Sequence, residues 1–314
     1  MVEPKAGLAF VFPGQGSQSV GMGRDWAAAH DLARETFEEA DEVLGFDLTG
    51  LCWQGPEDQL MRTANTQPAL LTVSVAMARV LAAAGIAPAM VAGHSLGEYA
   101  AHVAVGTLCF ADALRLVRRR GELMQAAVPV GVGAMAAILG LDLAAVRAVV
   151  EQTRGRRSDG EEVLAVANIN APGQIVIAGH RDSVAAAAER AMEHGARRAK
   201  LLAVSAPFHS PLMQPARAGL APLLRATDFA DPDVPVVVNI DARAITAGAS
   251  ARDALERQID GPVRWVESIA CMRTEGIEHF LEVGPGKVLC GLGKRIDRGA
   301  RWQSLPGPAA VADL

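Results

Sequence analysis

Short apolar runs alternate with longer helix-like segments along most of this chain. Runs such as GLAFVF, APAMVAG, VPVVVNI and HFLEVG are bounded by glycine, proline or polar residues, and helical patterns separate them. Strands that are apolar on both faces are typical of a parallel sheet that helices cover on each side. The sequence therefore predicts an α/β fold built around a parallel sheet.

The composition fits a soluble globular protein. Its 314 residues are enough for a large core and for two lobes. The formal net charge of −5 provides no basic field that would attract nucleic acid. The four cysteines form no C-x-x-C pair, which argues against a zinc cluster or a disulfide framework and favours the reducing cytoplasm. The N-terminus lacks the long apolar run of a signal peptide.

One uncharged stretch, Leu123 to Leu141, approaches the length of a membrane span. It contains Pro129, Gly131 and Gly133, which disfavour a continuous helix. We therefore interpret it as the end of a helix followed by a buried strand, and we expect no membrane association.

The middle of the chain has a different order of elements. GAMAAILGL and DLAAVRAVVEQT are predicted as a strand and a helix, and a charged loop, RGRRSDGEE, follows them. Two strands, VLAVANI and GQIVIAG, then precede the helix RDSVAAAAERAMEHG and the strand ARRAKLLAV. This βαββαβ order is that of a ferredoxin-like unit. We expect a ferredoxin-like subdomain over residues 130–205, inserted into a large α/β domain formed by residues 1–129 and 206–314.

The most specific chemical motif is G-x-S-x-G at residues 93–97, which places Ser95 between a predicted strand and a predicted helix. In a nucleophile elbow, flanking glycines allow the sharp turn that exposes the serine, and the following helix directs N–H groups toward an oxyanion. The alternative is a serine that only caps the helix in a tight turn. The strand–turn–helix context favours the nucleophile.

A serine nucleophile needs a base, and His209 is a candidate because of its position. It lies in SAPFHSPLM, a proline-bounded loop where the predicted insertion returns to the large domain. The alternative is a histidine with only a structural role in that turn. Gln15, among the glycines of FPGQGSQ at a predicted strand end, can offer a backbone N–H to an oxyanion.

Arg120 lies in the middle of the apolar arc of a predicted helix over residues 111–128. A buried guanidinium cannot lose its charge and therefore requires an anionic partner. That partner is either an internal carboxylate, which is the commoner case, or the carboxylate of a substrate held by a bidentate pair of hydrogen bonds.

Seven segments together resemble the malonyl-CoA:acyl carrier protein transacylase family, the malonyl-loading enzymes of bacterial fatty acid synthesis. In chain order they are FVFPGQGSQ, TQPALL, AGHSLGEYAA, RRRGELMQAAVP, NAPGQIVIAGH, APFHSPLM and LEVGPGKVL. The resemblance extends from about residue 8 to residue 296, in the order of the family. It implies a hydrolase-like α/β lobe with a ferredoxin-like insertion.

The resemblance also implies a role for each candidate residue. Ser95 would be the acylated nucleophile and His209 its base. The backbone N–H groups of Gln15 and Leu96 would form the oxyanion hole. Arg120 would bind the malonyl carboxylate, which would supply the missing anion.

Three further positions match supporting residues of the family. The backbone carbonyl of Gln258 would orient the histidine in place of a catalytic aspartate, while Gln67 and Asn170 match polar positions near the active site. The resemblance implies no metal and no cofactor, because the coenzyme A thioester and the pantetheine of the carrier protein are substrates. The expected partners are malonyl-CoA and acyl carrier protein, and we expect a cytoplasmic monomer.

Other functions share the elbow and the base. A serine thioesterase would pass the acyl group to water, but a hydrolase of uncharged acyl chains has no use for a buried cation at position 120. A non-catalytic scaffold that binds the carrier protein would normally lack Ser95 or His209, and both are present. A stand-alone malonyltransferase of this family can also serve a polyketide synthase.

Overall fold

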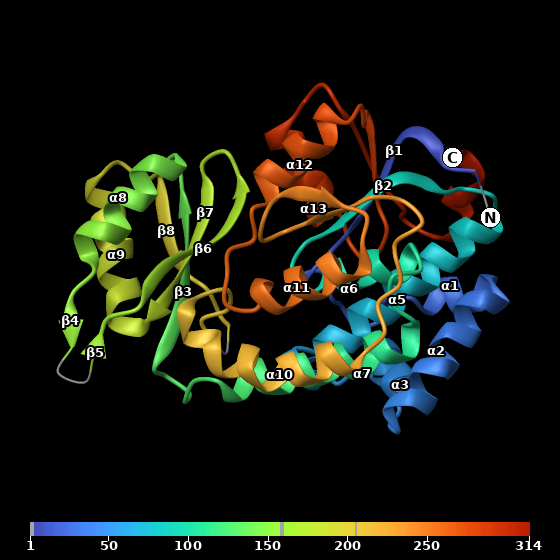
Figure 1. Ribbon diagram of the computed structural model, residues 1–314, viewed down its shortest axis with the longest axis horizontal. Helices are drawn as coiled ribbons and strands as arrows, with labels where there is room; N and C mark the ends of the chain where they lie inside the picture. Colours follow the sequence, from blue (N-terminus) through green and yellow to red (C-terminus); the bar gives the residue numbers. More distant parts are fainter. Residues whose placement is uncertain (1–2, 158–159, 205) are drawn as a thin grey trace.

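The computed structural model describes residues 3–157, 160–204 and 206–314. Figure 1 shows a large lobe that holds both ends of the chain and a smaller lobe formed by its middle part. The large lobe is built around one sheet with helices on both faces, and the small lobe has a sheet of its own. The predicted α/β class is confirmed.

The large sheet has the strand order β10-β9-β2-β1-β11-β12. All neighbours pair in parallel except β10, which runs antiparallel to β9. The predicted parallel sheet is thus extended at one edge by an antiparallel strand, because the four residues between β9 and β10 are too few for a parallel crossover. The strands are β1 (Lys5–Phe12), β2 (Pro88–Gly93), β9 (Val236–Val238), β10 (Arg243–Ile245), β11 (His279–Glu282) and β12 (Arg301–Ser304).

Strand β1 shows why these strands are apolar throughout. Phe10 and Phe12 pack into one core with residues of α5 and α7, whereas Ala9 and Val11 pack into another with residues of α12 and α13. The helices of the large lobe are α1 (Arg24–Ala29), α2 (Asp31–Leu44), α3 (Leu48–Gln54), α4 (Glu57–Leu60), α5 (Thr63–Ala83), α6 (Gly97–Ala104), α7 (Phe110–Ala126), α10 (Gln214–Ala226), α11 (Gly248–Gln258), α12 (Trp265–Thr274) and α13 (Val288–Ile296). Two short 3₁₀ helices, Pro211–Met213 and Pro308–Asp313, complete it.

Among the described residues, α5 alone is long and apolar enough to cross a membrane, but 83% of its most apolar window is buried inside the protein. That burial is typical of a core helix. The uncharged stretch over residues 123–141 is not one helix: α7 ends at Ala126 and β3 begins at Gly133, as predicted.

The small lobe contains a four-stranded sheet of order β6-β7-β3-β8 in which all neighbours are antiparallel. Its elements are β3 (Gly133–Leu139), α8 (Leu143–Thr153), β4 (Arg156–Arg157), β5 (Gly160–Glu161), β6 (Leu164–Ala171), β7 (Gln174–His180), α9 (Arg181–Glu193) and β8 (Arg198–Leu201). Apart from β4 and β5, this is the βαββαβ order of the prediction. The borders at residues 130 and 205 stay a prediction.

The charged segment RGRRSDGEE, predicted as a loop, contains the two-residue strands β4 and β5, which pair with each other. Residues 158 and 159 of that segment lie outside the described residues. The two lobes are joined by backbone hydrogen bonds between β6 and the segment after α11: Ile169 N donates to Val263 O at 2.9 Å, and Val263 N donates to Ala167 O at 2.9 Å. This contact brings the small lobe next to the carboxyl end of the large sheet.

Candidate active site

Ser95 occupies the turn between β2 and α6. Its backbone has a φ of 52°, in the left-handed region that is unfavourable for a residue with a side chain. Neither Gly93 nor Gly97 has a positive φ, yet both have no room for a side chain. A Cβ on Gly93 would lie 1.9 Å from Gly97 C, and one on Gly97 would lie 2.1 Å from Phe12 O. The glycines thus permit close packing of the turn, while the serine itself makes the sharp bend.

Replacing Gly93 with alanine is therefore expected to unfold or displace the turn. The added methyl group overlaps main-chain atoms, and forced overpacking typically costs about 1–3 kcal/mol or more. Thermal unfolding should occur at a lower temperature, and reactivity at Ser95 should be lost. Gly291→Ala is the control, because a Cβ at that position meets nothing within 4 Å. Equal unfolding temperatures for both variants and the unmodified protein would contradict this account.

Ser95 and His209 form a hydrogen-bonded pair. Ser95 Oγ lies 2.6 Å from His209 Nε2, and the imidazole is only 4% exposed. On the far side of the ring, His209 Nδ1 lies 2.9 Å from Gln258 O and 3.2 Å from Gly261 O. Because carbonyl oxygens only accept, Nδ1 carries the proton and Nε2 is free to accept one from the serine hydroxyl. Two carbonyls thus take the orienting place that an aspartate holds in other triads.

The environment also keeps His209 neutral. Burial, reinforced by the nearby positive charge of Arg120, lowers the pKa of His209 from 6.5 to about 3. A neutral imidazole is the form that can act as a general base. The active form therefore predominates at all pH values above the lowered pKa and is lost only as the pH falls through it.

Acylation of Ser95 by a thioester is accordingly expected to show no decrease in rate near pH 6.5 from protonation of His209. The measurement is kcat/KM for acylation between about pH 8 and pH 5. Burial raises the pKa of the neighbouring Glu98 to about 7, so Glu98→Gln is measured in parallel to remove that titration. A decrease in kcat/KM near pH 6.5 that persists in this variant would contradict the assignment of His209 as a buried base that stays neutral.

Arg120 is 1% exposed and points at the same serine. Its Nη1 donates to Gln67 Oε1 at 2.9 Å, and its Nη2 donates to Gln258 Oε1 at 3.0 Å and to Ser95 Oγ at 3.2 Å. Within the described part of the chain, no carboxylate forms an ion pair with Arg120. Of the two predicted alternatives, a direct internal salt bridge is therefore not found among these residues. Glu98 attracts the guanidinium electrostatically and is linked to it only through Gln258, while the charge faces the reactive oxygen.

The predicted oxyanion donors are also free. Among the described residues, no hydrogen bond involves the backbone N–H of Gln15 or of Leu96. Leu96 precedes the first turn of α6, where N–H groups lack helical partners. Gln15 is tied to the site through its side chain, because its Oε1 accepts from Gln67 Nε2 at 3.3 Å.

Asn170 lies farther from the chemistry than the other candidates. Its Oδ1 is 2.8 Å from His94 Nε2, so it contacts the residue before the nucleophile. All the predicted site residues therefore lie in one connected region. No cluster of His, Cys, Asp and Glu side chains within the described ranges could hold a metal ion.

Sequence reasoning missed three contributors, namely Gly261, Glu98 and Asn239. Asn239 Oδ1 accepts from Ser95 N at 2.7 Å, and Glu98 Oε2 accepts from Gln258 Nε2 at 2.9 Å. The sequence offered one indication of Asn239, which was its position at the end of a strand. Asn239 is a polar residue directly after a buried parallel strand, where functional groups of α/β proteins gather.

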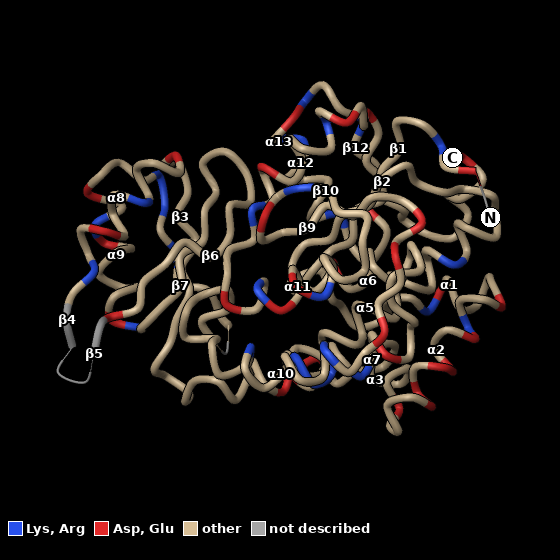
Figure 2. Tube along the Cα trace, in the orientation of Figure 1, with Lys and Arg blue, Asp and Glu red and all other residues tan. Residues whose placement is uncertain are grey.

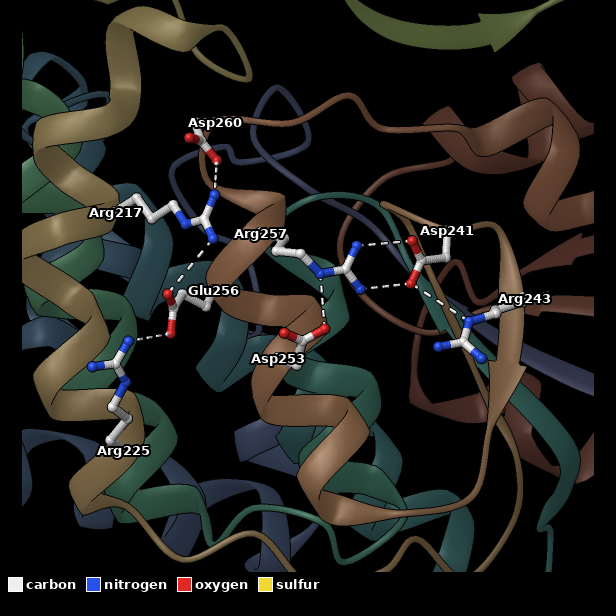
Figure 3. Close-up of polar contacts among 8 residues, drawn as sticks. All are labelled: Arg217, Arg225, Asp241, Arg243, Asp253, Glu256, Arg257 and Asp260. Atoms are coloured by element: carbon white, nitrogen blue, oxygen red, sulfur yellow. Dashed lines mark hydrogen bonds and ion pairs between the residues drawn. The ribbon is translucent and has the colours of Figure 1, made fainter.

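Ion pairs fix the outer side of the segment that carries the Gln258 carbonyl (Figure 3). Arg257 donates to both carboxylate oxygens of Asp241, at 2.8 and 2.6 Å, and Arg217 lies 3.4 Å from Asp260. These hydrogen bonds from Arg257 lower the pKa of Asp241. The side chains are partly exposed, so each pair contributes about 1 kcal/mol or less. Together they connect the end of α11 to α10 and to the β9–β10 connection.

Known proteins resemble this chain over nearly its whole length. A family model described as the acyl transferase domain matches residues 9–298. The malonyl CoA-acyl carrier protein transacylase of Escherichia coli (strain K12) is 51% identical over 306 residues, which is 97% of each chain. The crystal structure of an acyl carrier protein S-malonyltransferase from Vibrio cholerae is 45% identical, with a TM-score of 0.94 over 98% of this chain and 99% of that one.

A malonyl-transacylase solved in complex with a type II polyketide acyl carrier protein is 44% identical, with a TM-score of 0.93 over 97% of each chain. Identity at this level over nearly whole chains shows the family. The chain therefore belongs to the acyl transferase domain family and, within it, to the malonyl-CoA:acyl carrier protein transacylases.

Proposed function

We propose that this protein moves the malonyl group from malonyl-CoA to the pantetheine thiol of acyl carrier protein through a malonyl ester of Ser95. One observation carries the proposal. The buried Arg120 guanidinium has no carboxylate partner among the described residues and lies 3.2 Å from a serine oxygen that is 2.6 Å from a neutral histidine. An acyl group on Ser95 that ends in a carboxylate would supply the missing anion.

In the first half-reaction, His209 Nε2 takes the hydroxyl proton as Ser95 Oγ attacks the thioester carbonyl carbon. The negative charge that develops on the carbonyl oxygen is stabilised by the Gln15 and Leu96 amides. The carbon–sulfur bond then breaks, and His209 returns the proton to the departing coenzyme A thiolate. Arg120 holds the malonyl carboxylate throughout and so orients the acyl group.

In the second half-reaction, the pantetheine thiol gives its proton to His209 and attacks the Ser95 ester. The carbon–oxygen bond breaks, and His209 reprotonates the serine. The same groups act in reverse order, so double-displacement kinetics are expected. No step calls for a metal or a cofactor, because the base, the oxyanion donors and the cation are all side-chain or backbone groups of this chain.

We place the reaction in the cytoplasm, as the supply of malonyl groups for fatty acid synthesis, with the protein acting as a monomer. Because the proposed site is complete within a single chain, a monomer would be sufficient for the reaction. Supply of a polyketide synthase is a second candidate, favoured by the 44% identity to a transacylase solved with a polyketide carrier protein.

The test is to follow the fate of the malonyl group. The protein is incubated with malonyl-CoA and holo acyl carrier protein, and both malonylated carrier and free malonate are quantified. The proposal expects the carrier to receive nearly all of the malonyl group. Free malonate as the main product would mean that water is the acceptor, and a thioesterase would replace the proposed transferase. Fatty acid and polyketide carriers compared at equal concentration distinguish the two pathways.

A further inference from the structure

Asn239 is completely buried and brackets the turn that carries Ser95. Its side-chain Oδ1 accepts a hydrogen bond from Ser95 N at 2.7 Å, while its Nδ2 donates to Gly93 O at 2.7 Å. One amide thus joins the residues on either side of His94. The amide oxygen accepts one hydrogen bond and the amide nitrogen donates the other, so each atom has the partner that it requires.

The same residue connects to the rest of the site through Glu98. The backbone N–H of Asn239 donates to Glu98 Oε2 at 2.8 Å, and that oxygen also accepts from Gln258 Nε2 at 2.9 Å. Gln258 Nε2 in turn lies 3.0 Å from Ser95 O, which closes a ring of hydrogen bonds around the nucleophile. Because the Glu98 carboxylate accepts at this position, Gln258 must turn its amide oxygen toward Arg120.

This ring explains how a strained residue stays in place. Ser95 has a left-handed backbone, which persists only where its surroundings hold it there. The Asn239 amide supplies that restraint through Ser95 N and Gly93 O. It also occupies the N–H of Ser95, so this amide is not available to an oxyanion and the neighbouring Leu96 N–H is the free one.

We propose that Asn239 is a positioning residue for the reaction, which fixes the Ser95 turn and thereby the aim of Oγ at the thioester carbon. This inference rests on the proposed transferase function. It predicts an effect on the chemical step rather than on binding, because Asn239 contacts the turn and none of the groups proposed to hold malonyl-CoA.

The first test is Asn239→Ala. A small displacement of a reacting group slows a reaction by a large factor. The kcat per folded molecule should therefore fall by about 10- to 100-fold. KM for malonyl-CoA should stay within about twofold, since the Asn239 side chain forms no hydrogen bond with Arg120 or with the Gln67 and Gln258 amides that hold it. The amount of folded protein is measured by thermal unfolding. A kcat per folded molecule equal to that of the unmodified protein would overturn the proposal.

The second test, Asn239→Asp, is sharper because its outcome depends on pH. A protonated aspartic acid reproduces the pattern of asparagine, since one oxygen can accept from Ser95 N and the O–H can donate to Gly93 O. An ionised carboxylate loses that donor and faces the Gly93 carbonyl with like partial charge. The charged groups around it are Glu98 on α6, Asp241 on the same connection and Arg264 before α12. Burial near Glu98 favours the protonated form.

The rate of this variant relative to the unmodified protein should therefore rise as the pH falls from about 8 to about 5.5. The titration of His209 is present in both proteins and cancels in the ratio. Glu98 contacts position 239, so in the variant the two carboxyl groups titrate as a pair, and the ratio reports that pair. Asn65→Asp, an amide outside the site, is the control and should give a ratio independent of pH. A flat ratio for Asn239→Asp would overturn the proposal. If the unmodified protein itself transfers no malonyl group, the proposed function fails instead, and the two failures are thus distinct.

Discussion

Replacing Arg120 with alanine is expected to remove most of the protein's activity with malonyl-CoA while leaving its activity with acetyl-CoA little changed. The guanidinium is buried, is held by Gln67 and Gln258, and lies beside the oxygen that carries the acyl group. Loss of one partner of a buried charge pair costs about 2–5 kcal/mol, so kcat/KM for malonyl-CoA should fall at least about 30-fold. Acetyl-CoA has no carboxylate and loses no such contact.

The measurement is kcat/KM for both thioesters in the same preparation. Arg119→Ala is the matched control, because Arg119 lies on the exposed side of the same helix and pairs with Glu122 at 3.1 Å. It should leave the ratio of the two substrates unchanged. An unchanged preference for malonyl-CoA in the Arg120 variant would remove the role assigned to this residue.

Replacing His209 with alanine is expected to slow acylation of Ser95 by about 10²–10⁴-fold, the range typical of a lost general base. The hydroxyl of Ser95 would keep its hydrogen bond from Arg120 but would have nothing to take its proton. Binding should change little, since the imidazole contacts the serine and two backbone carbonyls. The experiment is a rapid-mixing measurement of acyl-enzyme formation at saturating malonyl-CoA.

An exposed histidine serves as the control for that experiment. His194 directly follows α9 in the small lobe, and its replacement by alanine should leave the acylation rate unchanged. A His209 variant that acylates within a factor of ten of the unmodified protein would show that another group removes the proton.

The main elements of the fold were predictable because hydrophobic periodicity dominates them. Strands β1, β2, β9 and β11 are short apolar runs, and the helices between them carry the 3.6-residue pattern. Strand β10 was not predicted, because RAI is short and half polar and pairs at an edge. The sequence also does not mark the start of α5 at Thr63, since Pro68 lies inside the helix rather than at its beginning.

The candidate site was predictable where a residue type is chemically unusual in its place. A serine between glycines after a strand, and an arginine on an apolar arc, both stood out from the sequence. The positions of Gln67, Asn170 and Gln258 came only from the family resemblance. Asn239 and Glu98 were missed because their roles depend on contacts between residues more than 140 positions apart. The position of Asn239 after a buried strand marks it as a candidate, but no local pattern shows which residues it contacts.

The structural reason for the two glycines of the motif could not be predicted from the sequence either. Sequence reasoning attributes them to the flexibility of the turn, yet the structure shows that they allow main-chain segments to touch. The left-handed residue is Ser95 itself. Which residue of a turn carries the unusual φ depends on how β1, β2 and α6 pack together, and that packing involves residues from three separate segments.

The covalent intermediate is the central claim of this account, and the mass of the intact protein tests it most directly. The protein is mixed briefly with malonyl-CoA, in parallel with acetyl-CoA and with a Ser95→Ala variant, and its mass is recorded before and after holo acyl carrier protein is added. We predict one malonyl adduct on the unmodified protein, none on the variant, and loss of the adduct when the carrier protein is present. An adduct that survives in the Ser95→Ala variant, or no adduct while malonate accumulates, would contradict the account.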